Sequence, residues 1–156
     1  MTTVSSERIV RRPPAEVFDF VARNHFRNHP RWDPDVVEMT QTTPGPVGVG
    51  TTARVVRRQG KREVEGTATV TAYEPDRAAA WDVRFGPFLL HQRSEYAPEQ
   101  NGQATRLWLS VETTARGLMR FLLPLMRGRF RRTIARSLDT IAGLIEGGES
   151  APSAGR

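Results

Sequence analysis

Apolar residues recur every three or four positions near the C-terminal end of the chain. The repeating positions are Met126, Phe130, Ile134, Leu138, Ile141 and Ile145. This spacing places the apolar side chains on one face of a helix, and arginines fill much of the remaining turn. We therefore predict a basic amphipathic helix from about Leu118 to Ile145, with Pro124 starting its long part after a short helix over 117–123.

The middle of the chain shows the alternation of apolar and polar residues that is typical of strands. The predicted strands are Val4–Arg11, Val36–Thr43, Thr51–Arg58, Lys61–Tyr73, Ala78–Phe85, Phe88–Ala97 and Thr105–Thr114. Short turns such as Gln59-Gly60 and Asn101-Gly102 join neighbouring strands, which predicts an antiparallel meander. Pro13 and Pro14 favour a helix start before Ala15–Arg23, and 24–35 is a short irregular or helical stretch.

The strand-rich middle is the surface that the terminal helix needs. A sheet wrapped around a single helix leaves an internal cavity, so we interpret the chain as an α+β protein that encloses a ligand-sized space. The parity of the strands indicates which side chains face inward. Small residues on the face of Val64, Gly66, Ala68, Val70 and Ala72 would leave space there. An ordinary core filled with side chains is the alternative.

Several segments together resemble the START-like superfamily, which includes polyketide cyclases and lipid carriers. They are RPPAEVFDFVARNHFRNHPRW, YEPDRAAAW, ATRLWLSVE after an Asn-Gly turn, and LMRFLLPLMRGRFRRTIARSLDTIAGLIE. The resemblance implies a helix-grip fold, in which a seven-stranded antiparallel sheet curls around the long C-terminal helix and two short helices follow the first strand. We expect one ligand-binding domain over residues 1–146 and a disordered tail over 147–156.

The inward parity and the resemblance together nominate a ligand-binding set. It comprises Trp32, Trp81, Val83, Phe85, Phe88, Leu90, Gln92, Tyr96, Leu107, Leu109, Met119, Met126 and Phe130. Trp32 is included because its segment closes the cavity mouth in the resembling family, although simple packing would explain it equally well. An apolar lining with a few polar groups such as Gln92 and Tyr96 is typical of a small-molecule pocket.

Composition narrows the possible classes of protein. The 156 residues suit one domain, and the absence of cysteine excludes disulfides, thiolate metal sites and a cysteine nucleophile. The N-terminal segment lacks the apolar stretch of a signal peptide, and the most apolar stretch, 117–126, is too short to span a membrane. We expect a soluble, cytoplasmic protein that is either a monomer or a homodimer.

The net charge of +6 raises the question of an anionic partner. The densest basic cluster is Arg116, Arg120, Arg127, Arg129, Arg131, Arg132 and Arg136. It is either a solvated helix face or a docking surface, for example for peripheral contact with an anionic membrane. No nucleic-acid partner is expected, because the chain has no basic motif with interleaved aromatic residues.

The sequence contains few side chains suited to metal binding or catalysis. His25 and His29 would share a helix face, but no third metal ligand is evident beyond Asp33 or Asp35, so we expect no metal site and no cofactor. Strand carboxylates mostly fall on the outward parity, and we assign no catalytic residue.

Three hypotheses follow. The first and favoured one is binding or carrying of an apolar small molecule (a lipid, an isoprenoid or a polyketide-like compound) in an internal cavity. The second is an enzyme of the polyketide cyclase/dehydratase type, which needs a titratable side chain in the cavity. The third is docking on an anionic membrane or a partner through the arginine-rich helix. The shortage of inward-facing titratable residues favours the first over the second.

Overall fold

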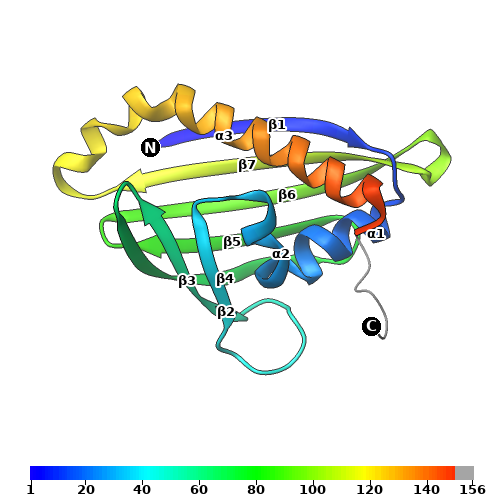
Figure 1. The fold of residues 1–156 in the computed structure, drawn as a ribbon, viewed down its shortest axis with the longest axis horizontal. Coiled ribbons are helices and arrows are strands. Elements are labelled where there is room, and N and C mark those ends of the chain that lie inside the picture. Colours follow the sequence, from blue (N-terminus) through cyan, green and yellow to red (C-terminus); the bar gives the residue numbers. More distant parts are fainter. Residues whose placement is uncertain (150–156) are drawn as a thin grey trace.

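The computed structural model describes residues 1–149 and contains one curved sheet crossed by a long helix (Figure 1). The strands are β1 (Thr2–Val10), β2 (Val36–Gln41), β3 (Thr52–Gln59), β4 (Arg62–Glu74), β5 (Ala78–Phe85), β6 (Phe88–Glu99) and β7 (Ala104–Ala115). All neighbouring pairs are antiparallel, in the order β1-β7-β6-β5-β4-β3-β2. This arrangement confirms the predicted α+β helix-grip fold with seven antiparallel strands.

The helical elements come in two groups. Between β1 and β2 lie α1 (Pro14–Phe18), η1 (Asp19–Arg23) and α2 (His25–Trp32), and after β7 lie η3 (Gly117–Phe121), α3 (Leu123–Leu144) and η4 (Ile145–Glu149). A short turn, η2 (Gln100–Gly102), joins β6 to β7. The long helix thus begins at Leu123, which places Pro124 in its first turn. The missing N–H of proline costs no helical hydrogen bond there.

The disordered tail expected over 147–156 stays a prediction. Residues 147–149 belong to η4, and Gly148 inside it has a φ of +87°. The rest of that predicted tail, 150–156, lies outside the described residues.

The apolar stripe of α3 packs into the curved sheet, as its spacing predicts. Ile134, Leu138, Ile141 and Ile145 are all buried in the same cluster as Trp81 and Phe85 of β5. The helix lies mainly along β1 and β7 at one edge of the sheet, while α2 packs against β2 at the other edge (Figure 1). The space between these two helices and the sheet is where a cavity can form.

A bulge in β4 changes one predicted face. Val70 is opposite Trp81, but the register shifts before Ala72, so that Tyr73 lies opposite Ala79. The ring of Tyr73 therefore turns inward and contacts Phe18 edge-on, with 5.2 Å between ring centroids. The prediction that Ala72 shares the inward face of Val70 is wrong for this reason.

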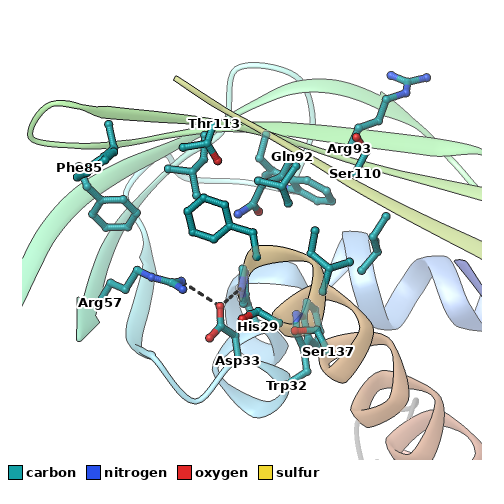
Figure 2. A pocket seen from close by; sticks show the side chains of 18 of the residues that line it. His29, Trp32, Asp33, Arg57, Phe85, Gln92, Arg93, Ser110, Thr113 and Ser137 are labelled. Carbon is teal, nitrogen blue, oxygen red and sulfur yellow. Dashed lines mark hydrogen bonds and ion pairs between the residues drawn. The ribbon is translucent and has the colours of Figure 1, made fainter. Parts of the chain in front are cut away.

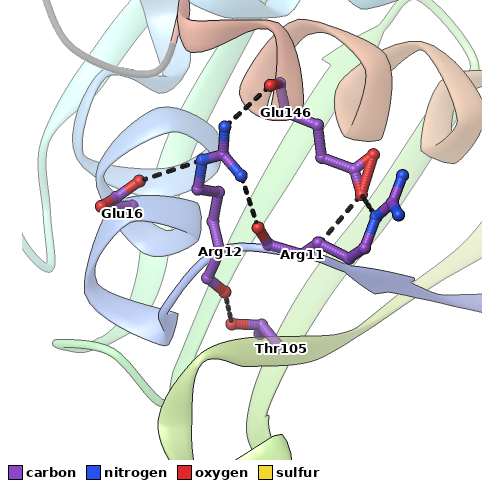
Figure 3. A network of polar contacts seen from close by, with 5 residues as sticks. All are labelled: Arg11, Arg12, Glu16, Thr105 and Glu146. Atoms are coloured by element: carbon purple, nitrogen blue, oxygen red, sulfur yellow. Dashed lines mark hydrogen bonds and ion pairs between the residues drawn. The ribbon is translucent and has the colours of Figure 1, made fainter.

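The helical turn η4, which continues α3, is tied to the corner between β1 and α1 (Figure 3). Arg12 donates from Nη2 to the carbonyl of Glu146 at 2.8 Å, and the backbone N–H of Arg11 donates to the Glu146 carboxylate at 3.0 Å. Burial alone would raise the pKa of Glu146, but the hydrogen bonds and charge of Arg11 lower it. The guanidinium of Arg12 also pairs with Glu16, and the backbone carbonyl of Arg12 accepts a hydrogen bond from the hydroxyl of Thr105. This end of the helix is fixed.

Candidate functional site

A partly enclosed cavity of about 200 Å³ lies between the sheet, α2 and the middle of α3 (Figure 2). Most of its wall is apolar, from β5, β6, β7 and α3. The lining residues are Val21, His25, His29, Trp32, Asp33, Arg57, Gln59, Trp81, Phe85, Phe88, Leu90, Gln92, Arg93, Leu109, Ser110, Val111, Thr113, Met126, Phe130, Thr133, Ile134 and Ser137. No helix within residues 1–149 combines the length and the apolar character that crossing a membrane requires.

Most of the nominated ligand-binding residues line this cavity. They are Trp32, Trp81, Phe85, Phe88, Leu90, Gln92, Leu109, Met126 and Phe130. Strand parity placed the residues of β5, β6 and β7, and helical spacing placed those of α3. Their contact with a ligand stays a prediction.

Four nominated residues lie elsewhere. Tyr96 and Leu107 are cross-strand partners and are both buried under α1, where the ring of Phe18 contacts Tyr96. The inward face of the sheet is therefore cavity wall at one end and packed core at the other. Val83 is buried in the core cluster between the lining residues of its strand, and Met119 lies half-exposed on η3, outside the cavity.

Tyr96 is unsuited to proton transfer in this structure. Its hydroxyl pairs with Ser94 Oγ at 2.9 Å, and both residues are buried. Burial raises the pKa of the Tyr96 phenol well above its usual range, although the Ser94 hydrogen bond opposes that shift. Its role here is packing.

A polar cluster forms one side of the cavity, and α2 supplies most of it. The four-residue spacing brings His25 and His29 to one helix face, where His25 Nε2 and His29 Nδ1 are 3.0 Å apart. Each imidazole stacks on an indole: His25 on Trp81 at 4.2 Å and His29 on Trp32 at 5.1 Å between ring centroids. The Trp81 indole N–H is buried and makes no hydrogen bond within the described residues.

The hydrogen bonds of the cluster define where most of its protons lie. His25 Nδ1 is 3.0 Å from the carbonyl of Val21, which can only accept, so this nitrogen carries a hydrogen. Burial, and then the nearby His29, hold the pKa of His25 well below its usual range, so His25 is neutral and its Nε2 accepts. His29 Nδ1 is consequently the donor in the pair. A hydrogen on His29 Nε2 would face Asp33, whose Oδ2 is 3.5 Å away.

Asp33 connects this helix to the sheet. Its Oδ2 accepts from Nη1 of Arg57 on β3 at 2.9 Å, so the carboxylate lies between Arg57 and His29 (Figure 2). Burial would raise the pKa of Asp33, but the hydrogen bond to His29 and the Arg57 charge lower it far more. Asp33 is therefore ionised, and it compensates the positive charge of Arg57 inside a mostly apolar site.

The prediction that few titratable side chains face the cavity is thus wrong. His25, His29, Asp33 and Arg57 all line the cavity. Arg57 shares the parity of the buried Val55 on β3, so alternation in that strand was the signal that could have found it. Asp33 had no comparable signal, because its place depends on how α2 packs. Within residues 1–149, no group of three or more His, Asp or Glu side chains is arranged to hold a metal ion.

The curved sheet, its C-terminal helix and the cavity between them define a START-like helix-grip fold. The chain belongs to the family described as polyketide cyclase / dehydrase and lipid transport, whose model matches residues 1–146. A search of curated proteins gives no significant match.

Solved structures show the same fold at low sequence identity. A START superfamily protein from Mycobacterium smegmatis is 14% identical, with a TM-score of 0.76 and 94% of this chain and 99% of that chain covered. The Zhui aromatase/cyclase from Streptomyces sp. R1128 is also 14% identical, with a TM-score of 0.75 and coverage of 99% and 98%. TTHA0849 from Thermus thermophilus is 13% identical, with a TM-score of 0.74 and coverage of 93% and 97%.

Proposed function

We propose that the protein binds a small apolar molecule with one hydrogen-bonding end. The observation that carries this proposal is the uneven distribution of charge in the cavity wall. Aromatic and aliphatic side chains cover most of it, whereas Asp33 and Arg57 meet at the side formed by α2 and β3. Arg93 also borders the cavity, but its side chain points away (Figure 2) and pairs with Glu95. An apolar wall with one polar corner orients a ligand as well as holding it.

The volume of the cavity limits the size of the ligand. A sealed apolar cavity of about 150 Å³ holds a molecule such as benzene, and this one measures about 200 Å³ with an opening to solvent. A compact aromatic, a short isoprenoid or a small polyketide-like ring system fits that volume. A lipid with two acyl chains does not fit inside it.

The charge balance of the polar corner favours a neutral ligand end. Asp33 lies against Arg57 and His29, and Asp35 adds a second carboxylate 3.9 Å from Arg57. These carboxylates use only part of the five N–H donors of the guanidinium. Gln92 offers a further amide in the same cavity, and the Trp81 N–H lacks an acceptor among the described residues. A carbonyl or hydroxyl oxygen would accept from such donors without adding a charge.

An enzyme of the cyclase/dehydratase type is the second candidate, and one observation favours it. His29 lies between a neutral imidazole and a carboxylate, and it lines the cavity. Because Nδ1 donates to His25, Nε2 is the nitrogen that would have to leave Asp33, 3.5 Å away, to exchange a proton with a ligand oxygen or a neighbouring carbon. Likeness to an aromatase/cyclase is consistent with this candidate but supports only the fold.

Native mass spectrometry of the full chain tests the first candidate. We expect a co-purifying small molecule that is released on denaturation and is apolar apart from one oxygen-bearing end. The fluorescent apolar probe 1-aminoanthracene should bind with one-to-one stoichiometry if the cavity is emptied. A protein that neither carries such a molecule nor binds the probe would contradict the proposal.

Turnover separates the two candidates. If the released molecule is a product, its open-chain precursor should be converted by the wild-type protein and not by His29→Gln. His91→Gln is the matched control, because His91 lies on the outer face and pairs with Asp82. Binding without conversion by any of the three proteins would leave a carrier.

A further inference from the structure

Four large apolar side chains are exposed where the chain passes from η3 into α3. The exposed fractions are 83% for Leu118, 62% for Phe121, 45% for Leu122 and 82% for Leu125. Their spacing of three and four residues puts them on one side of these helical turns, while Leu123 on the other side is fully buried. We call these four residues the apolar tip. Contiguous exposed apolar groups of this kind mark interaction sites rather than ordinary surface.

The apolar tip is surrounded by positive charge. Arg116 and Arg120 precede or interrupt it, and Arg127 follows it. All seven arginines from Arg116 to Arg136 are exposed, and residues 113–138 contain no aspartate or glutamate. The guanidinium of Arg120 also lies over the ring of Phe121, 4.7 Å from its centroid. An occupant of this surface must therefore be both apolar and anionic.

The position of the apolar tip relates it to the cavity. Figure 1 shows the yellow segment projecting beyond the end of β7, at the opposite end of α3 from the Glu146 contacts. The backbone N–H of Arg116 donates to the carbonyl of Pro87 at 3.0 Å, next to Phe88. Met126 follows the tip directly, and both Phe88 and Met126 line the cavity. The tip thus adjoins one end of the cavity wall.

A second copy of the chain is a poor occupant. In a symmetric dimer, the same patch of each copy meets its equivalent. Such a contact would bring Arg116, Arg120 and Arg127 of the two copies together, and the surrounding segment offers no carboxylate to balance them. Like charges placed together across an interface oppose association.

We propose that the apolar tip inserts into the interface of an anionic lipid bilayer, with the flanking arginines contacting lipid headgroups. Leucine and phenylalanine side chains enter the boundary between headgroups and acyl chains, and arginine adds attraction to anionic lipids. Docking in this way brings one end of the cavity wall close to the bilayer, where an apolar ligand could be exchanged. The docking itself does not depend on the identity of that ligand.

Vesicle flotation of the full chain tests the docking. The protein is mixed with vesicles of phosphatidylcholine alone or of phosphatidylcholine with phosphatidylglycerol, at low and at high salt. We expect it to float with the mixed vesicles at low salt, to be released at high salt because screening weakens surface attraction, and to stay with the soluble fraction when phosphatidylglycerol is absent. Equal flotation with both vesicle types, or none with either, would overturn the proposal.

Two pairs of variants assign the effect to the named residues. The double variant L118S/L125S should lower vesicle affinity about tenfold or more, whereas V49S, which removes another exposed apolar side chain (69% exposed), should not. The double variant R116Q/R120Q should lower it about tenfold, whereas R77Q, in the turn before β5 at the other end of the sheet, should change it little.

Unchanged circular dichroism melting would show that each variant is folded, as expected for exposed positions. Equal losses from the tip variants and the controls would contradict the assignment. So would a dimer that L118S/L125S dissociates, or binding to an acidic protein partner without binding to vesicles.

Discussion

Nη1 of Arg57 on β3 lies 2.9 Å from Oδ2 of Asp33, the C-cap residue directly after α2. The same carboxylate oxygen lies 3.5 Å from Nε2 of His29. This single contact joins the helix that carries both cavity histidines to the strand on the other side of the polar corner. The position of the imidazoles in the cavity thus depends on a charge pair that bridges two elements far apart in the sequence.

Replacing Asp33 should cost far more stability than replacing its neighbour. The side chain of Asp33 is 10% exposed and that of Asp35 is 51% exposed, although both face Arg57. Asp33→Asn removes the buried carboxylate of the pair and leaves the half-buried guanidinium of Arg57 with only the exposed Asp35 as counter-charge, so we expect the free energy of unfolding to fall by about 2–4 kcal/mol. Asp35→Asn should lower it by less than about 1 kcal/mol, because exposed pairs contribute little. Urea denaturation of both variants measures the difference, and similar losses would contradict the role given to burial.

The neutral state of His25 predicts a stability that falls in mild acid. Its pKa in the folded protein is well below the usual value, because of burial and then of His29, whereas the unfolded chain titrates near about 6.5. Below that pH the unfolded state binds a proton that the folded state does not. The contribution is therefore complete above about pH 6.5 and is lost at up to about 1.4 kcal/mol per pH unit as the pH falls further.

A variant lacking His25 isolates this effect from other titrations. The stability advantage of the wild-type protein over His25→Asn should shrink between about pH 7 and pH 5. His91→Asn removes an exposed imidazole that pairs with Asp82, so its difference from wild type should not follow that pattern. Urea unfolding at several pH values provides the comparison. A constant difference for His25→Asn would show that His25 does not carry the acid sensitivity.

Alternation and periodicity predicted the fold well because each element has a clear apolar side. The strands and the long helix could be placed from residues such as Trp81 in β5 and Ile134 in α3. The bulge before Ala72 could not be predicted, because an extra residue in one strand produces no recognisable pattern in the sequence. After the bulge, Tyr73 faces inward in β4 instead of Ala72.

The site was predicted only as far as parity reaches. Parity selects a face of the sheet but not the length over which that face stays open, so Tyr96 and Leu107 were included although α1 covers them. The polar corner depends on tertiary packing. Asp33 and Arg57 are 24 residues apart and meet only because α2 packs against the β2 edge of the sheet.

Gly66 should tolerate no side chain, in contrast to the glycines of α3. A Cβ at this position would overlap the carbonyl oxygen of Arg84 and lie 2.5 Å and 2.8 Å from two ring carbons of Phe85. We expect Gly66→Ala to lower the free energy of unfolding by about 2–3 kcal/mol through overpacking. Gly128→Ala, where a Cβ meets nothing within 4 Å, should raise it by about 0.5–1 kcal/mol. Thermal and urea melts test the pair, and a neutral Gly66→Ala would mean that β4 and β5 separate easily.

Filling the cavity should abolish ligand binding while the protein stays folded. Val111 on β7 lines the cavity, and its neighbour Glu112 is on the opposite face of the same strand, across from His91. Val111→Phe adds a ring to a space of about 200 Å³, so 1-aminoanthracene affinity should fall at least about tenfold, with a loss of stability of about 1–3 kcal/mol. Glu112→Phe places the same ring on the outer face and should leave probe affinity within about twofold of wild type. Fluorescence titration measures both affinities, and circular dichroism checks that each variant is folded. Full probe affinity in a folded Val111→Phe protein would place the ligand outside this cavity.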